Sequence, residues 1–157
     1  MSDPDSHLTL NDLYESDFLG SPFPRVIFEE TDGEVVVVDL VRGIYYYLTG
    51  TAAFLWMALH AGQSVGETAT RLSEVAEDGD EVSADLERFA LSLMREGLLE
   101  SRDAIADSEF SVPDLQVFVT GAYAPPVIET YSDLQDILLL DPVHDVDDSG
   151  WPTPRSN

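Results

Sequence analysis

Three short runs of β-branched and aromatic residues, separated by tight turns, constrain the fold of this chain more than any other feature. The runs are RVIFEE at residues 25–30, EVVVVDLV at residues 34–41 and IYYYLT at residues 44–49. The turns between them contain Gly33 and Gly43. Because connections this short join neighbouring strands in antiparallel fashion, the sequence predicts a three-stranded antiparallel meander.

Three helices are predicted directly after the meander. The first runs through TAAFLWMALHAG with one apolar face and ends at Gly62, and the second begins at a capping box of Ser64 and Glu67. The third is expected to have Asp80 as its N-cap and Gly97 in the left-handed conformation just past its end. The apolar positions expected to form one core are Leu55, Trp56, Leu72, Leu86, Phe89 and Leu93.

The order of strands and helices predicts an α+β fold at residues 25–102, with appended segments on both sides. We expect residues 1–24 to be a flexible, polar N-terminal arm. Residues 103–122 are expected to be a linker in which LQVFV could add one strand. Residues 123–157 are expected to form an extended C-terminal tail; it is acidic and still contains paired prolines, spaced aromatics and the aliphatic run ILLL at residues 137–140.

The formal net charge of −24 excludes several classes of partner. With 31 acidic residues against seven basic ones, the surface repels nucleic-acid phosphates and anionic lipid, so we expect neither nucleic acid nor membrane as a partner. The arginines are concentrated in the domain, whereas the tail is acidic. Two explanations are open: the tail and the domain attract each other, or the acidic residues simply form a solvated surface. The absence of cysteine and of a targeting segment is typical of a cytoplasmic protein.

The sequence offers no arrangement of residues for catalysis. Of the three histidines, His60 lies at the end of a helix, where contact with the helix dipole is favoured over a role as a general base. The segment DVDDSG at residues 145–150 matches half of a calcium loop, but Ser156 stands where the bidentate glutamate belongs. We therefore expect no enzyme activity, no catalytic residue, no metal and no cofactor.

Residues 33–100 resemble the PqqD-like family, the precursor-peptide recognition elements of ribosomally synthesised and post-translationally modified peptides (RiPPs). The residues that carry the resemblance are Leu48-Thr49 after the tyrosine-rich strand, Ala53 and Trp56, the spaced Val65, Glu67 and Leu72, and Ala84-Asp85-Leu86 running to Gly97-Leu98-Leu99. The resemblance implies a winged-helix-like fold that captures a leader peptide as an added strand and delivers it to a RiPP-modifying enzyme.

The last strand of the meander is the expected peptide-binding edge, since its free N–H and C=O groups would pair with an incoming strand. Its side chains alternate between two faces of the sheet. The third helix would add a second wall, whose face opposite the core is expected to expose one apolar residue between two arginines; the alternative is an ordinary solvated helix face. The expected peptide-binding residues are Ile44, Tyr45, Tyr46, Tyr47, Arg88, Leu91 and Arg95.

The tail resembles the leader of lasso-peptide precursors. Its spacing Tyr123-x-x-Pro126-x-Ile128, followed by Tyr131, matches the tyrosine, proline and aliphatic pattern of those leaders, although Ser132 stands where they usually have glycine. We expect residues 126–131 to fold back along IYYYLT, with Tyr123, Pro126, Ile128 and Tyr131 as leader-like anchors.

Three functions are compatible with these observations. The first is a non-catalytic adaptor that binds a precursor peptide for a RiPP-modifying enzyme while its own tail docks in the groove. The second is a fused precursor whose C-terminal tail is the modified substrate, and the third is a winged-helix DNA-binding regulator. The net charge of −24 disfavours the third. The sequence does not name the partner enzyme, the peptide, the modification or the oligomeric state.

Overall fold

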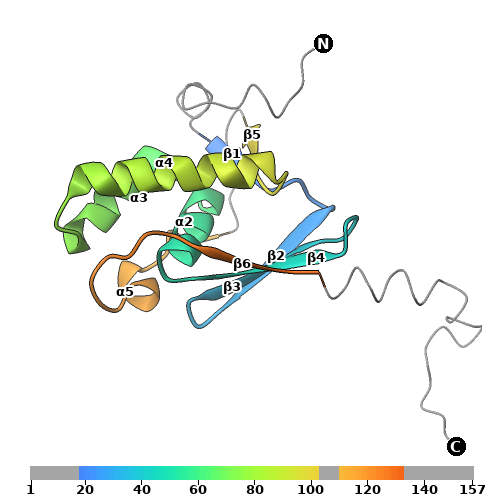
Figure 1. Ribbon diagram of the computed structural model, residues 1–157, viewed down its shortest axis with the longest axis horizontal. Helices are drawn as coiled ribbons and strands as arrows, with labels where there is room; N and C mark the ends of the chain where they lie inside the picture. The colour runs from blue at the N-terminus through green and yellow to red at the C-terminus, as the bar shows by residue number, and fades with distance from the viewer. Residues whose placement is uncertain (1–17, 103–109, 133–157) are drawn as a thin grey trace, which may run out of the picture.

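The computed structural model describes residues 18–102 and 110–132 of the 157-residue chain, and their elements confirm the α+β class (Figure 1). The aliphatic run at residues 137–140 and the half calcium loop at residues 145–150 lie outside the described residues. The elements are β1 (Phe18–Gly20), β2 (Val26–Thr31), β3 (Glu34–Asp39), β4 (Ile44–Thr49), α2 (Gly50–His60), α3 (Val65–Leu72), η2 (Ser73–Val75), α4 (Gly79–Arg95), β5 (Glu100–Arg102), α5 (Leu115–Phe118) and β6 (Ile128–Tyr131).

The predicted meander is confirmed: β2, β3 and β4 pair in antiparallel fashion in sequence order. Asp32 and Gly33 both have positive φ, of 53° and 85°, which the two-residue turn between β2 and β3 requires. Strand β6 adds a fourth strand beside β4, at the edge along which the tail was expected to fold back. A separate two-stranded sheet pairs β1 with β5.

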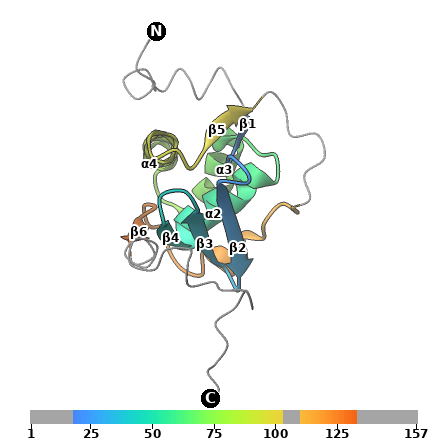
Figure 2. The same ribbon diagram turned by 90° about the vertical axis from the view of Figure 1, so that its right-hand side faces the viewer.

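Helix α2 occupies the centre of the molecule, between the four-stranded sheet on one side and α3 with α4 on the other (Figures 1 and 2). Every residue from Thr51 to His60 is buried. The expectation that α2 has a single apolar face was therefore wrong, because the sheet and the other helices cover it from all sides. The sequence TAAFLWMALH suits this position, since a helix that is apolar all round belongs in a core.

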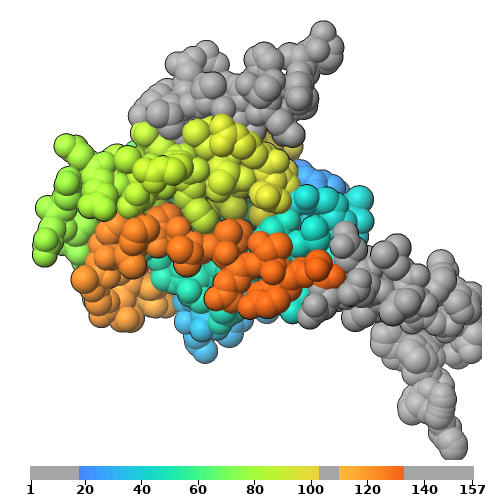
Figure 3. Space-filling model, in the orientation of Figure 1, coloured from blue at the N-terminus to red at the C-terminus, as the bar shows by residue number. Residues whose placement is uncertain are grey.

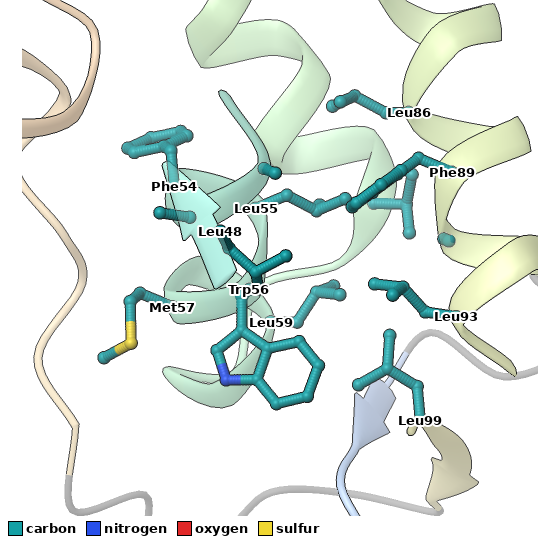
Figure 4. Packing of buried hydrophobic residues seen from close by; sticks show 14 of the residues in the cluster. Leu48, Phe54, Leu55, Trp56, Met57, Leu59, Leu86, Phe89, Leu93 and Leu99 are labelled. Carbon is teal, nitrogen blue, oxygen red and sulfur yellow. The ribbon is translucent and has the colours of Figure 1, made fainter. Parts of the chain in front are cut away.

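The six predicted core residues are all buried, and all but Leu72 are labelled in Figure 4, where they converge from α2 and α4. The capping box of Ser64 and Glu67 at the start of α3 is present, with hydrogen bonds of 3.0 and 2.9 Å. Gly97 has a φ of 80°, and the Leu98 N–H donates to the Leu93 carbonyl, as expected of a left-handed helix end. The N-cap of α4 is Asp78 rather than Asp80, because the Asp78 carboxylate accepts the first-turn N–H groups.

Two segments outside the meander and helices differ from expectation. Phe18–Gly20 was assigned to a flexible arm, yet it forms β1 against β5 and buries Leu19. LQVFV was expected as a weak strand, but Leu115–Phe118 forms one helical turn instead, since the Asp114 side chain accepts the Gln116 N–H at 3.0 Å. This turn buries Leu115 in the core.

A buried carboxylate joins the sheet to the end of α4. Asp39 is fully buried and accepts hydrogen bonds from the guanidinium groups of Arg25 and Arg42. Those arginines also donate to the backbone carbonyls of Gly97 and Glu96 at the end of α4. Burial alone raises the pKa of Asp39, but the hydrogen bonds and charge of Arg42, with the charge of Arg25, outweigh it and hold the pKa below its ordinary value.

His60 is a buried structural residue, which corrects the expectation of a helix-dipole contact. Its Nδ1–H donates to the Trp56 carbonyl at 2.7 Å, and its Nε2 accepts the Ser21 N–H at 3.2 Å. These contacts join the segment after β1 to the end of α2. Burial and the charge of Arg102 lower the pKa of His60 to about 4, against the opposing hydrogen bond to Trp56. The ring is therefore neutral at physiological pH.

We expect Leu86→Ala to lower the free energy of unfolding by about 2–5 kcal/mol, because it leaves a cavity in the packed core between α2 and α4. Urea denaturation measures this change. The control is Glu87→Ala, on the next residue of the same helix and only half-buried. A loss below about 1 kcal/mol for Leu86→Ala would contradict the packing described for this helix.

The low pKa of His60 predicts a loss of stability on acidification. Its folded pKa of about 4 lies below the unfolded value of about 6.5, so the unfolded chain binds more protons between these values. The free energy of unfolding should therefore fall by up to about 3 kcal/mol as the pH drops from 7 to 4. In His60→Gln, which retains a donor and an acceptor, the same titration should lack this component. Equal pH slopes in the two proteins would show that His60 does not titrate as described.

A candidate peptide-binding groove between strand β4 and helix α4

The predicted peptide-binding edge of the sheet is occupied by a segment of the same chain. Strand β6 lies antiparallel to β4, with Tyr45 opposite Tyr131 and Leu48 opposite Ile128. Figure 3 shows residues 121–132, in orange, running along the boundary between α4 and β4. The geometry matches the expected fold-back of the tail, although the paired strand covers residues 128–131 rather than 126–131. We call the channel that holds residues 123–131 the β4–α4 groove.

Tyr123 enters one end of the groove and forms polar contacts there. Its hydroxyl donates to the Asp85 carboxylate at 2.8 Å, and its N–H donates to the Val75 carbonyl at 3.3 Å. Asp85 also forms an ion pair with Arg88 at 3.2 Å. Burial, together with the hydrogen bond and negative charge of Asp85, raises the pKa of Tyr123 well above its ordinary value. The phenol is therefore a protonated donor, as the contact with a carboxylate requires.

The paired prolines lie against α4 just after this anchor. The Thr51 hydroxyl donates to the Ala124 carbonyl at 2.7 Å and so holds the backbone before the prolines. Pro125 and Pro126 then line a pocket, of which Pro126 is the more buried. The α4 residues of that pocket are Asp85, Arg88, Phe89 and Ser92. Since proline has no N–H, this stretch lies in the groove without leaving a backbone donor unpaired.

The strand itself combines backbone pairing with alternating side chains. Ile128 is half-buried and packs against the core, whereas Glu129 and Thr130 are exposed. The ring of Tyr131 stacks on Tyr45, with ring centroids 5.0 Å apart and planes 19° from parallel. The apolar anchors of the segment therefore contact the domain, while its polar residues face outward.

The predicted peptide-binding residues of β4 divide between the two faces of the sheet. Tyr45 and Tyr47 are half-buried on the outer face, and Ile44 is half-buried against the core. Tyr46 is buried, and its hydroxyl accepts from Arg42 at 2.9 Å and lies 3.4 Å from a carboxylate oxygen of Glu96. The Tyr46 side chain therefore holds β4 to the end of α4. Only the backbone of Tyr46 is left to pair with a peptide.

The predicted face of α4 is corrected at one position. Arg88 and Arg95 are exposed, as expected, but Leu91 is buried in the core. The buried arc of α4 includes Ala90 as well as the predicted apolar stripe, so it is wider than the spacing of that stripe indicated. The exposed arginines therefore do not flank an exposed leucine.

Sequence reasoning missed several residues that contact the bound segment. Thr51 and Asp85 bind it through hydrogen bonds, and Ser92 lines the proline pocket. Thr51 was assigned to the start of a helix, and Asp85 was noted only for the family resemblance. Neither has a sequence signal that specifies a contact with a segment more than 35 residues away.

The described residues contain no cluster of histidine, cysteine, aspartate or glutamate that could hold a metal ion. Within residues 18–102 and 110–132, no helix is long and apolar enough to cross a membrane. The features of the groove are a strand edge that pairs with an added strand, a helix wall and pockets for single side chains. Such a site can bind an extended polypeptide.

The fold and the groove define an α+β domain that carries a strand on its sheet edge. Residues 34–99 match the family described as Coenzyme PQQ synthesis protein D (PqqD), so this region of the chain is similar to that family. No curated protein matches the chain. A similar solved structure is "TbiB1 in Complex with the TbiA(beta) Leader Peptide", with 28% identity, a TM-score of 0.48, and coverage of 56% of this chain and 99% of that one.

We expect Tyr123→Phe to weaken the docking of the segment without unfolding the domain. The substitution removes the hydroxyl that binds Asp85 and keeps the ring, so the free energy of unfolding should fall by about 1–2 kcal/mol. Thermal and urea denaturation measure the change. Tyr131→Phe is the matched control, because its hydroxyl donates to Glu129 within the segment. Equal effects of the two substitutions would show that the Asp85 contact has no special role.

Proposed function

We propose that the β4–α4 groove binds a precursor leader peptide as an added strand and that the protein is a non-catalytic adaptor for a RiPP-modifying enzyme. The observation that carries the proposal is the register of β6 on β4, which places an extended segment on an edge strand. The PqqD-like match of residues 34–99 supports the same reading.

Strand addition separates affinity from specificity. Main-chain hydrogen bonds along β4 accept many sequences, whereas side-chain pockets select among them. In this groove the selective contacts would be the Asp85 carboxylate for a tyrosine hydroxyl, the pocket beside Phe89 for a proline, and the core edge next to Leu48 for an aliphatic residue. We propose Tyr123, Pro126, Ile128 and Tyr131 as leader-like anchors because they occupy or adjoin these positions.

The tail of the chain would then act as a competitor for a leader peptide. If the isolated segment binds with a dissociation constant near ~1 μM, tethering at an effective concentration near ~1 mM favours the docked form about a thousandfold. A leader supplied in trans has to overcome this bias. The tail would therefore set the threshold at which a leader occupies the groove.

Proline substitutions in β6 test the proposal in the full chain. Adjacent residues of an edge strand direct their N–H groups in opposite directions, so only one of Glu129→Pro and Thr130→Pro removes a hydrogen bond to β4. That variant should bind a fluorescent peptide of residues 122–132 at least about tenfold more tightly than the unsubstituted chain, because its own strand no longer competes. Fluorescence anisotropy measures the binding.

The matched controls are Glu129→Ala and Thr130→Ala, which keep the backbone donor and should bind the peptide like the unsubstituted chain. Peptide binding that is equally weak in all four variants and in the unsubstituted chain would show that the groove is not a peptide site. Proline in β4 itself is a less direct test, since the Tyr46 side chain is buried. Removal of the whole tail by truncation after Ser111 would also free the groove, but it is unsuitable as a test because it removes the buried side chains of Leu115 and Val119.

The fused-precursor function remains a second candidate because the docked strand and the sequence that follows it belong to one chain. In that case the residues after Tyr131 would be the substrate that the domain presents. Mass spectrometry of the protein from its native source distinguishes the two functions. A modified or cleaved C-terminal segment is required of a precursor, whereas an adaptor retains the encoded mass.

A further inference from the structure

The end of the sheet where the docked strand leaves the groove has an exposed apolar surface. Phe23, Leu40 and Val41 have exposed fractions of 78%, 52% and 73%. Leu40 and Val41 are consecutive residues of the turn between β3 and β4, and the Leu40 N–H donates at 2.8 Å to the carbonyl of Arg25, two residues after Phe23. We call these three residues the end patch. Apolar side chains grouped in this way indicate a contact surface.

The direction of β6 brings the following residues to this patch. Each paired position on β4 decreases by one as β6 advances by one, from Leu48–Ile128 to Tyr45–Tyr131. The last pair, Tyr45–Tyr131, lies two residues from the turn that carries Val41, and a strand that kept the same register would then approach Gly43 and Arg42. The chain therefore leaves the groove next to the end patch and not at the opposite end of the sheet.

The charges around the end patch suit the sequence that arrives there. In a chain of formal net charge −24, Arg42 directly follows Val41, and Arg25 is joined to Leu40 by a backbone hydrogen bond; both guanidinium groups also pair with Asp39. Arg95 immediately precedes Glu96, whose carbonyl accepts from Arg42. Residues 132–140 have the sequence SDLQDILLL, in which two aspartates precede an aliphatic run. The aspartates are opposite in charge to the arginines, and the aliphatic run is apolar like the patch.

We infer that residues 132–140 of this chain dock on the end patch, with the aliphatic run covering Phe23, Leu40 and Val41 and the aspartates beside Arg42 and Arg95. The patch would then be a second subsite that continues the β4–α4 groove beyond the strand. If the proposed peptide-binding function holds, a leader supplied in trans would bind the same subsite when acidic residues and then aliphatic residues follow its paired strand.

Disulfide trapping in the full chain tests this docking, because the sequence contains no cysteine. The test pair is Val41→Cys with Leu138→Cys, and the control pair is Val117→Cys with Leu138→Cys. Val117 is also exposed, and its backbone adjoins Gly33 at the opposite end of the sheet. Residue 138 lies seven positions after Tyr131, or about 23 Å when extended, and a six-residue strand spans about 20 Å, so an undocked tail reaches both positions.

The test pair should form an intrachain disulfide at least about tenfold faster than the control pair, since docking raises the local concentration of one thiol near the other. Replacement of Asp133 and Asp136 by lysine should reduce that advantage. Equal rates for the two pairs would overturn the inference, and so would a test-pair disulfide that links two chains, which would assign the patch to a second copy. Thermal unfolding verifies that both double variants are folded. None of these readouts requires peptide binding, so they fail independently of the proposed function.

Discussion

The Asp39 carboxylate holds together the two walls on which the groove depends. This carboxylate is fully buried. Its Oδ1 accepts hydrogen bonds from the backbone N–H groups of Val41 and Arg42, and its Oδ2 accepts hydrogen bonds from the guanidinium groups of Arg25 and Arg42. One residue thus shapes the turn before β4 and orients both arginines toward the carbonyls at the end of α4. Removal of the carboxylate would leave two partly buried cations without their shared partner, a costly arrangement.

The contacts of Asp39 hold the two walls of the groove together without involving residues 123–131. The width of the β4–α4 groove is set at one end by the Arg42 contact with Glu96 and by the buried Tyr46 hydroxyl between them. At the other end, α2 and α3 position α4 against the core. A site with fixed walls requires little reorganisation on binding, so more of the interaction energy remains for affinity.

The parts of the fold that could be predicted are those encoded by local signals. The alternating strands, the turn at Gly33, the capping box at Ser64 and the left-handed Gly97 each depend on a few neighbouring residues, and all are present. The all-round burial of α2, the burial of Leu91 and the pairing of β1 with β5 depend on which elements cover which faces, so periodicity could not specify them.

In the groove, too, some features are encoded by local sequence and others depend on tertiary contacts. The edge strand and the spacing of Tyr123, Pro126 and Ile128 could be read from the sequence, because strand addition and anchor spacing are linear properties. The contacts made by Thr51 and Asp85 could not, because each joins residues distant in the chain. The tertiary structure also separates exposed Arg88 from buried Leu91 on one helix, a difference that a single stripe of apolar positions did not predict.

Amide hydrogen exchange along β4 and β6 tests the central claim most directly, namely that the β4 edge is a strand-binding site occupied by the chain's own residues 128–131. The account predicts that β6 amides are protected in the free protein and lose protection when a peptide of residues 122–132 is added in excess, while β4 amides stay protected. Exchange of β6 at the unprotected rate from the start, or retained β6 protection while the peptide binds, would contradict the account.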